Sequence, residues 1–270
     1  MKRPLIVGNW KLYVTNRDNA VERAQKVARK SGAVHADIII CPPFPFLESL
    51  HKVLSKRKIA VGAQTVSTSG EEKRTGEVTA QMAASVGAQF SIVGHSERRA
   101  MGESSEDIQA KIKSIFGAKM SPILCIGEEL RDTTSGDHFS QIGDQLRASL
   151  PELSPKEASS LIVAYEPIWA IGKSATEAMS PEQLEETVIY IRKILADIVG
   201  RAAALRISIL YGGSVEPENA NALMKSGVSG FLVGHASVDP EALIEIAKQA
   251  GGANSSGPVR NSGRARRKRV

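Results

Sequence analysis

Cysteines, aromatic residues and long apolar stretches are all scarce in this sequence. Only 2 of the 270 residues are cysteine, Cys41 and Cys125, and their wide spacing argues against a disulfide scaffold and for a reducing compartment. Aromatic residues make up 4% of the chain, so a core must rest on Ile, Leu, Val and Ala. A chain of this length can bury most of its unfolded surface, and it needs no covalent staple.

The sequence also lacks any signal for a membrane. The apolar run Leu5–Val7 is too short for the hydrophobic region of a signal peptide, and no stretch of the chain is long enough to span a bilayer. We therefore expect a cytoplasmic protein without membrane contacts.

Signals for a bound metal are missing as well. The five histidines show no helical ligand spacing and there is no Cys-x-x-Cys motif, so we expect no metal site. His35, His51 and His138 do not follow a predicted strand, and we expect them at the surface.

The net charge of +6 comes from one end of the chain. Without the six basic residues near that end, the sequence has 29 basic and 29 acidic residues. From Gly251 onward the chain has too little apolar matter to fold alone, so we expect a catalytic domain over residues 1–250 and a disordered basic tail over residues 251–270. The tail could contact nucleic acid or another anionic surface, or be a solvated extension without a role. Its basic residues are Arg260, Arg264, Arg266, Arg267, Lys268 and Arg269.

Eight short apolar runs recur along the chain, and each ends near a polar residue or a glycine. Such runs are typical of parallel strands whose two faces are both covered. Helical stretches separate them, and together they predict an α/β protein with a single (β/α)8 barrel. The alternative, a doubly wound open sheet, is weakened because no two glycines are spaced as Gly-x-Gly. The predicted strands are Leu5–Gly8, Ile38–Cys41, Ile59–Ala63, Phe90–Gly94, Ile123–Gly127, Leu161–Tyr165, Ile207–Tyr211 and Phe231–Gly234, and the predicted helices include Asn19–Lys30, Glu106–Phe116, Pro181–Ile198 and Pro240–Ala250.

Two residues that follow predicted strands could carry acid–base chemistry, because a barrel places its catalytic groups at the strand ends. Glu166 follows the sixth run, and it could act as a general base or form a buried structural salt bridge. His95 follows the fourth run, and a helix beginning there would keep its ring neutral and able to donate a hydrogen bond to a carbonyl. As a single histidine, His95 could equally belong to the core.

Two glycine-bearing turns, Gly212-Gly213-Ser214 and Gly234-His235, follow the last two runs. A barrel commonly binds phosphate there, since backbone N–H groups and a following helix N-terminus can hold an anion. Lys11, after the first run, could add a positive charge. The simpler alternative is that these glycines only end the strands tightly.

Together these motifs resemble the triosephosphate isomerase family. The resemblance implies a TIM barrel, no cofactor, a homodimer, and the interconversion of dihydroxyacetone phosphate and D-glyceraldehyde 3-phosphate in glycolysis and gluconeogenesis. The matching segments, in order, are Gly8-Asn9-Trp10-Lys11, Pro42-Pro43-Phe44, Thr75-Gly76-Glu77, Ile92-Val93-Gly94-His95-Ser96-Glu97-Arg98-Arg99, Leu124-Cys125-Ile126-Gly127-Glu128, Tyr165-Glu166-Pro167-Ile168-Trp169-Ala170-Ile171-Gly172, Tyr211-Gly212-Gly213-Ser214-Val215 and Leu232-Val233-Gly234.

The same resemblance implies a role for each site residue. Glu166 would abstract the carbon-bound proton, and His95 would polarise the carbonyl as a neutral electrophile. Lys11 would balance the charge of the phosphate and the enediolate, Asn9 would orient the substrate, and Glu97 would pair with a catalytic cation. A lid over residues 166–180 would exclude water. The phosphate would be bound by Gly172, Ser214, Gly234 and the amide of His235.

The chain departs from the family pattern at three places. The segment after Gly172 lacks the usual Thr-Gly-Lys-Thr-like stretch, which alters the far hinge of the lid. His235 stands where many members have a second glycine, and its ring could either point to solvent or add a charge beside the phosphate. Lys73-Arg74 occupy the loop tip that enters the partner subunit in the family, which predicts a polar, salt-sensitive contact there.

Two other functions are compatible with the same pattern. Another phosphate-binding barrel enzyme, such as an aldolase, is possible from the fold alone, but it would need a Schiff-base lysine, a metal or a larger pocket, and only Lys11 follows a predicted strand. A catalytically silent protein that binds through its basic tail is the second alternative. The presence of Lys11, His95 and Glu166 argues against it.

Overall fold

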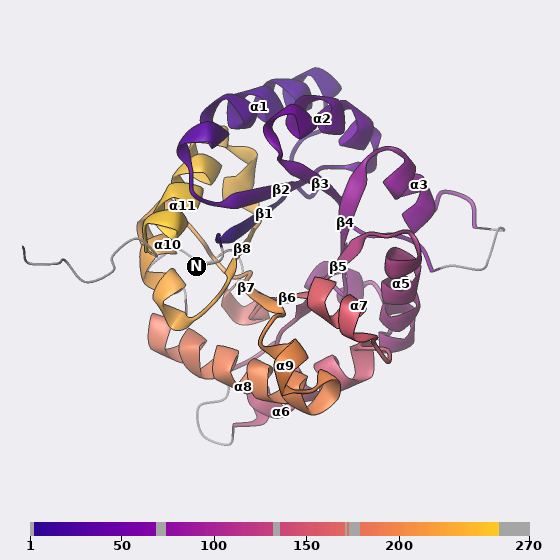
Figure 1. The fold of residues 1–270 in the computed structure, drawn as a ribbon, viewed down its shortest axis with the longest axis vertical. Helices are drawn as coiled ribbons and strands as arrows, with labels where there is room; N and C mark the ends of the chain where they lie inside the picture. Colours follow the sequence, from indigo (N-terminus) through magenta and orange to yellow (C-terminus); the bar gives the residue numbers. More distant parts are fainter. Residues whose placement is uncertain (1–2, 69–73, 132–135, 171, 173–178, 254–270) are drawn as a thin grey trace, which may run out of the picture.

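Eight parallel strands close into a barrel in their sequence order, with the helices around it (Figure 1). This computed structural model describes residues 3–68, 74–131, 136–170, 172 and 179–253. Every predicted strand overlaps an observed one, so the predicted (β/α)8 barrel is confirmed. The strands are β1 (Leu5–Asn9), β2 (Asp37–Cys41), β3 (Ala60–Ala63), β4 (Ala88–Val93), β5 (Ser121–Ile126), β6 (Ile162–Tyr165), β7 (Ser208–Tyr211) and β8 (Gly230–Val233).

The helices begin where side chains can cap their first N–H groups. Asn16 accepts hydrogen bonds from the backbone N–H groups of Asp18 and Asn19 at the start of the first helix, and Ser180 and Gln183 form a capping box at the start of the eighth. The α-helices are α1 (Arg17–Lys30), α2 (Leu47–Leu54), α3 (Ala80–Ser85), α4 (Ser96–Ala100), α5 (Ser105–Gly117), α6 (Asp137–Ser149), α7 (Pro155–Ser160), α8 (Pro181–Val199), α9 (Arg201–Ala204), α10 (Pro217–Leu223) and α11 (Pro240–Ala253). Short 3-10 turns are η1 (Ser31–Ala33), η2 (Phe44–Phe46), η3 (Ser55–Arg57), η4 (Ile168–Ala170), η5 (Met224–Ser226) and η6 (His235–Val238).

The buried apolar residues form two clusters, one between strands and helices and a smaller one made of alternate strand residues. Because side chains alternate between the two faces of a strand, the smaller cluster, which includes Val7, Ala164 and Leu232, fills the inside of the barrel. Two residues further along β1 and β6, the same alternation turns Asn9 and Glu166 inward. The barrel interior therefore leads directly to the candidate site.

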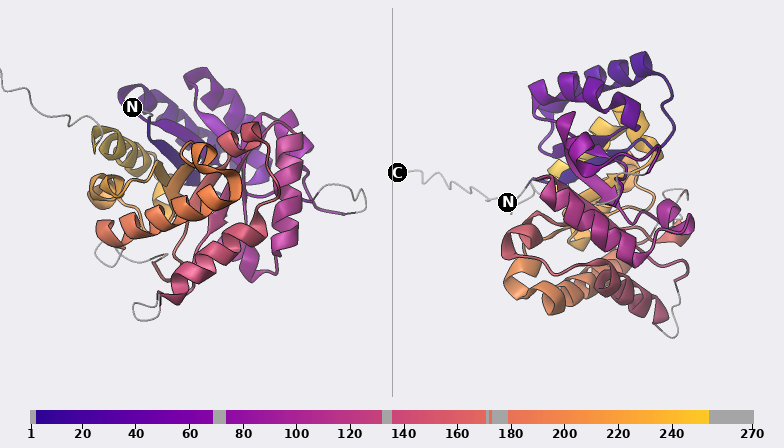
Figure 2. Two further views of the ribbon diagram at one scale, coloured as in Figure 1. Left: turned by 60° about the horizontal axis from the view of Figure 1, so that its bottom comes forward. Right: turned by 90° about the vertical axis from the view of Figure 1, so that its right-hand side faces the viewer.

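The two faces of the barrel differ in which chain segments they carry. In the right-hand view of Figure 2, the start of β1 lies on one face, and the loops that follow the strands lie on the other. Across the described residues, no helix is both long and apolar enough to cross a membrane.

The expectation that His35, His51 and His138 all lie at the surface is wrong for His138. His35 is exposed and His51 is half-buried, but only 4% of the His138 side chain is exposed. Its ring packs against Phe139, which in turn contacts Tyr190 of α8. His138 lies in the first turn of α6, a helix that packs against α8, and its burial follows from tertiary packing that the histidine spacing does not reveal.

Candidate active site

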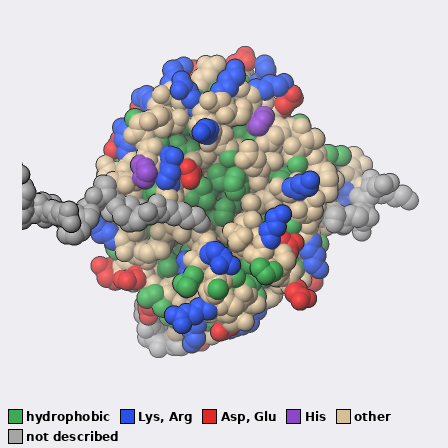
Figure 3. Space-filling view, viewed as in Figure 1, with side chains coloured by type: hydrophobic (Ala, Val, Ile, Leu, Met, Phe, Trp, Pro, Cys, Tyr) green, Lys and Arg blue, Asp and Glu red, His purple; other side chains and the backbone are tan. Residues whose placement is uncertain are grey.

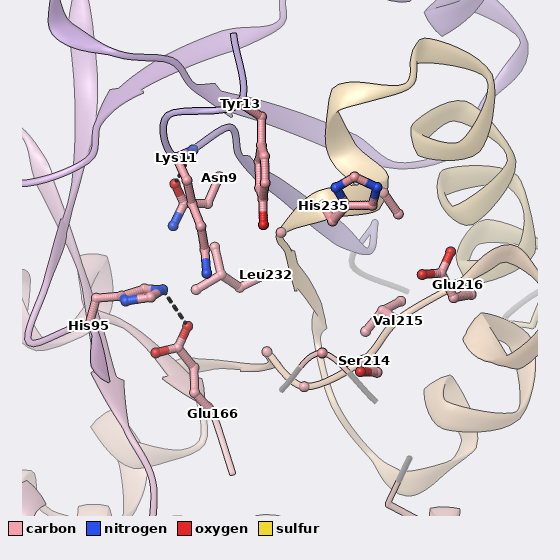
Figure 4. A pocket seen from close by; sticks show the side chains of 15 residues that line it. Asn9, Lys11, Tyr13, His95, Glu166, Ser214, Val215, Glu216, Leu232 and His235 are labelled. Atoms are coloured by element: carbon pink, nitrogen blue, oxygen red, sulfur yellow. Dashed lines mark hydrogen bonds and ion pairs between the residues drawn. The ribbon is translucent and has the colours of Figure 1, made fainter. Parts of the chain in front are cut away.

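A cavity of about 340 Å³ opens at the carboxyl ends of the strands. Its walls come from loops that are far apart in the sequence and that the barrel closure brings together (Figure 4). Of the residues singled out from the sequence, only Glu97 does not line this cavity. The others that line it are Asn9, Lys11, His95, Glu166, Gly172, Ser214, Gly234 and His235.

Glu166 and His95 face each other at the floor of the cavity. The Glu166 side chain is almost fully buried, and its Oε1 lies 3.3 Å from Nε2 of His95. The other carboxylate oxygen, Oε2, is buried without a hydrogen-bond partner among the described groups. A buried carboxylate with one uncommitted oxygen is well suited to accept a proton from a bound molecule.

The backbone around His95 selects one tautomer of its ring. His95 caps α4, and its Nδ1 accepts a hydrogen bond of 3.2 Å from the N–H of Glu97. An imidazole nitrogen that accepts a hydrogen bond carries no proton, so the proton of the neutral ring sits on Nε2. Nε2–H points into the cavity, toward Glu166, where it can donate to a carbonyl oxygen.

Lys11 is held in an unusual backbone conformation beside these two residues. Its φ is +42°, a region that non-glycine residues rarely adopt. Asn9 Oδ1 accepts from the Lys11 N–H at 3.1 Å, and Gln64 Nε2 donates to the Lys11 carbonyl at 2.9 Å. The Lys11 ammonium lies 2.6 Å from a carboxylate oxygen of Glu97. Glu97 thus contacts the cation from outside the cavity wall, and Asn9 and Gln64 fix the strained loop.

Two small or buried neighbours fit closely around Glu166. A Cβ on Gly212 would lie 2.7 Å from Cγ of Glu166, so only glycine leaves room for the carboxylate in this position. On another side is the Cys125 thiol, whose pKa is raised well above its ordinary value by burial and, secondarily, by Glu166. Cys125 therefore remains a neutral thiol beside the carboxylate.

The opposite end of the cavity is built from turns that expose backbone N–H groups. Gly172, Ser214, Gly234 and His235 line it, and His235 begins η6, so its N–H has no partner within that turn. His235 does not have a positive φ, so it stands in place of a glycine without backbone strain. Its exposed ring packs edge-on against Tyr13 with ring centroids 5.1 Å apart.

A carboxyl group also lies at this end of the cavity. Glu216 is half-buried, and burial together with the nearby Glu218 raises its pKa, while His235 acts in the opposite direction. A carboxyl group that holds its proton more readily repels a bound anion less. Glu216, Tyr13 and Gln64 are site residues that the sequence analysis missed, although Gln64 follows β3 and could have been found from its strand-end position.

Hydrogen bonds tie the two ends of the cavity to each other. Ser214 Oγ donates to the carbonyl of Ala170 at 2.9 Å, and Asn219 Nδ2 donates to the carbonyl of Ser214 at 3.0 Å. Trp169 Nε1 donates to the buried Glu128 carboxylate at 2.8 Å, which fixes the chain just beyond Glu166. Seven of the fifteen residues of the predicted lid, 171 and 173–178, lie outside the described residues, as does Lys73 at the predicted dimer loop.

The geometry defines a barrel enzyme whose pocket suits an anion at one end and carries a carboxylate and a neutral imidazole at the other. A carboxylate and an imidazole placed in this way can move a proton next to a carbonyl group. Within the described ranges, no three His, Cys, Asp or Glu side chains come together as a metal site would require.

Comparisons with known proteins agree with this class. A family model described as triosephosphate isomerase matches residues 4–250. Similar relatives include the triosephosphate isomerases of Thermus thermophilus, 39% identical with 93% of this chain and 100% of the relative covered, and of Symbiobacterium thermophilum, 36% identical with 93% and 98% covered. A crystal structure of triosephosphate isomerase from Bartonella henselae superposes with a TM-score of 0.79 at 30% identity, covering 92% of this chain and 98% of that one. The chain belongs to the triosephosphate isomerase family, and its activity is the isomerisation of triose phosphates.

Proposed function

We propose that Glu166, His95 and Lys11 carry out the interconversion of dihydroxyacetone phosphate and D-glyceraldehyde 3-phosphate. Glu166 removes a proton from the carbon beside the carbonyl, and the C–H electron pair forms the double bond of an enediolate. Nε2–H of His95 donates to the oxygen on which charge develops, and the Lys11 ammonium stabilises that charge. Through Nε2 of His95, the proton of the neighbouring hydroxyl is passed to the former carbonyl oxygen. Glu166 returns its proton to the neighbouring carbon, so the carbonyl moves by one carbon and no atom is gained or lost.

The observation that carries this proposal is the 3.3 Å approach of the buried Glu166 carboxylate to His95 Nε2. The Nδ1 hydrogen bond from Glu97 supports the neutral Nε2–H tautomer that the step requires. Asn9 is assigned to orient the substrate, and Glu97 to hold Lys11.

The phosphate group belongs, in this proposal, at the far end of the cavity. Its contacts are the backbone N–H groups around Gly172, Ser214, Gly234 and His235, which lie in turns that follow strands and precede helical segments. In this proposal the phosphate binds at one end of the pocket and proton transfer takes place at the other, so a three-carbon phosphate would reach both ends.

The test is a coupled assay with D-glyceraldehyde 3-phosphate on the wild type and on Glu166→Gln. Gln keeps the shape of the side chain and removes the base, so kcat should fall by about 10²–10⁴-fold with the fold intact. A variant that kept more than about a tenth of the wild-type kcat would remove Glu166 from this role.

The rival aldolase chemistry would require a lysine free to attack a carbonyl. Lys11 is the one lysine that lines the described part of the cavity, and its Nζ is paired with Glu97. Trapping with borohydride and dihydroxyacetone phosphate should therefore leave Lys11 unmodified, and a reduced adduct on Lys11 would favour the aldolase. Retention of binding without turnover in the coupled assay would favour a silent binding protein.

We also propose that the chain acts as a homodimer. Three of the large apolar side chains that are exposed among the described residues, Leu12, Met82 and Met101, come from segments that follow β1, β3 and β4. Burying them against a second copy would remove this apolar surface from water.

Sedimentation of Met101→Lys tests the dimer. This variant should dissociate at micromolar concentrations where the wild type stays dimeric. The matched control is Leu205→Lys, which places the same charge on an exposed leucine that follows α9. Equal behaviour of the two variants would contradict the proposed interface.

A further inference from the structure

The side-chain amide of Gln145 makes two hydrogen bonds with the backbone of a single residue. Its Oε1 accepts from the N–H of Gly127 at 2.9 Å, and its Nε2 donates to the carbonyl of Gly127 at 2.9 Å. Gln145 lies in the second half of α6, and Gly127 directly follows β5. Both ends of the amide are therefore committed to one point at the end of a barrel strand.

These two bonds complete a strand edge that β4 leaves open. The carbonyls of Ile126 and Glu128 accept hydrogen bonds from the chain that continues β6. The N–H and carbonyl of Gly127, which lies between them, therefore point to the other side, toward β4. Because β4 ends before it reaches this level, the amide of Gln145 takes the place of the missing strand.

Gly127 packs directly against the backbone of Glu166. A Cβ on Gly127 would overlap the carbonyl oxygen of Glu166 and lie 2.5 Å from its carbonyl carbon, so there is no room for a methyl group between the two backbones. The N–H of Glu166 also donates to the carbonyl of Ile126 at 2.7 Å, one residue before Gly127. Because close-packed interiors transmit strain, a shift of Gly127 would be passed on to Glu166.

Glu166 needs this support because one of its sides borders open space. It lines the cavity at the carboxyl ends of the strands, and its Oε2 has no hydrogen-bond partner among the described groups. The opposite end of the barrel differs, since apolar side chains gather in the central hollow seen in Figure 3, whose wall includes Leu5 and Phe90. Apolar packing can hold the strands at that end, whereas at the carboxyl ends hydrogen bonds from outside the barrel hold the backbone.

A second side chain links the same helix to the site. Arg99 of α4 donates to the carbonyl of Gly94 at 2.8 Å and to Ser149 Oγ of α6 at 3.1 Å. Gly94 precedes His95, so α6 is linked to the backbone beside both proposed catalytic residues, to one through Arg99 and to the other through Gln145. Since α6 packs against α5 and α8 on the outside of the barrel (Figure 1), it can act as a rigid support.

We propose that Gln145 is a positioning residue for Glu166 and acts through Gly127, an inference that rests on the proposed role of Glu166 as the base. The amide holds Gly127 against the backbone of Glu166 and thereby fixes the position of the carboxylate relative to the carbon that loses its proton. If loss of the two hydrogen bonds lets the carboxylate shift by about 0.5 Å, kcat should fall about tenfold, because a misplacement of about 1 Å can cost about 10²-fold.

The experiment is steady-state turnover of D-glyceraldehyde 3-phosphate by Gln145→Met, whose side chain has nearly the same length and cannot pair with the peptide. We expect kcat to fall about tenfold and KM to stay within about twofold, because the phosphate contacts are assigned to other turns. The matched control is Gln109→Met, which removes a hydrogen bond of 2.8 Å to the carbonyl of Ala148 in α6 and leaves Gly127 untouched. Its kcat should stay within about twofold of the wild type.

A double-mutant cycle separates positioning from a general effect on the fold. In the Glu166→Gln background, Gln145→Met should lower the remaining kcat by less than about twofold, because no base is left to misplace. A tenfold loss in both backgrounds would show a general effect and overturn the positioning role. Glu166→Gln alone tests the proposed function, since a wild-type kcat in that variant would mean that the base is misassigned, whatever Gln145 does.

Gln145→Glu is the second variant, for the case in which Gln145→Met does not fold. It keeps the acceptor for the Gly127 N–H and removes only the donor to the Gly127 carbonyl, so kcat should again fall while KM changes little. A folded enzyme of either variant with kcat within about twofold of the wild type would overturn the proposal. Failure of both variants to fold would make Gln145 a structural residue and would overturn it as well.

Discussion

Gly212→Ala tests whether the position of the Glu166 carboxylate limits catalysis. The added Cβ would lie 2.7 Å from Glu166 Cγ, and a displacement of about 0.7 Å is needed to restore an ordinary contact of 3.4 Å. Glu166 is almost fully buried, so it has little room to move aside. A misplacement of about 1 Å can cost about 10²-fold in rate, so we expect a loss in kcat of about 25-fold, or ~1.9 kcal/mol of activation free energy.

The assay is steady-state turnover of D-glyceraldehyde 3-phosphate with circular dichroism of the same samples. KM should change far less than kcat, because the Cβ added at Gly212 would meet Glu166, whereas the phosphate contacts are assigned to Gly172, Ser214, Gly234 and His235. The matched control is Gly117→Ala at the end of α5, where an added Cβ meets nothing within 4 Å. A folded Gly212→Ala enzyme with kcat within threefold of wild type would refute the reasoning that this glycine sets the position of the base.

Three further outcomes follow from the structure. If the His235 ring adds charge beside the phosphate, KM should be higher in His235→Gln and His235→Gly than in the wild type; equal KM values for all three would leave only the backbone amide. Ending the chain after Ala253 should leave kcat/KM with D-glyceraldehyde 3-phosphate unchanged, since Gly251 near the end of α11 packs against His35, which precedes β2 and so lies at the amino ends of the strands, opposite the cavity; a tenfold loss would contradict this expectation. Burial raises the pKa of the Cys41 thiol to about 12, so at pH 8 only about one molecule in 10⁴ carries a thiolate at this position. Iodoacetamide should therefore label Cys41 only after unfolding. Rapid labelling of Cys41 in the native enzyme would disprove its burial.

The barrel was predictable because its strands must be apolar along their whole length. Both faces of each strand are covered, so runs such as Ile123–Gly127 stand out without an alternating pattern. The predicted helix starts at Pro181 and Pro240 are those of α8 and α11, because a capping side chain and a proline in the first turn act locally. The boundaries differ by a few residues, as at α11, which continues three residues beyond the predicted Ala250.

The strand-end rule also located most of the cavity. It pointed to Lys11, His95 and Glu166, which are far apart in the sequence and reach one pocket only because the barrel closes. The resemblance to a family then suggested roles for them.

What the sequence did not reveal depends on three-dimensional packing. The positive φ of Lys11 is supported by a hydrogen bond from Gln64, which follows β3. No local sequence pattern around Lys11 predicts this conformation. The burial of His138 depends on tertiary packing around α6, and the interaction of Cys125 with Glu166 depends on the pairing of β5 with β6. Such properties belong to pairs of distant segments, which single-sequence patterns do not encode.

The most direct test of the central claim is deuterium incorporation during turnover. Dihydroxyacetone phosphate is converted in D₂O and the product is examined by NMR for deuterium at the carbon that receives the proton. If Glu166 carries the proton through an enediolate, the wild type should introduce solvent deuterium at that carbon, and Glu166→Gln should lose incorporation and turnover together. Undiminished incorporation by Glu166→Gln would contradict the account.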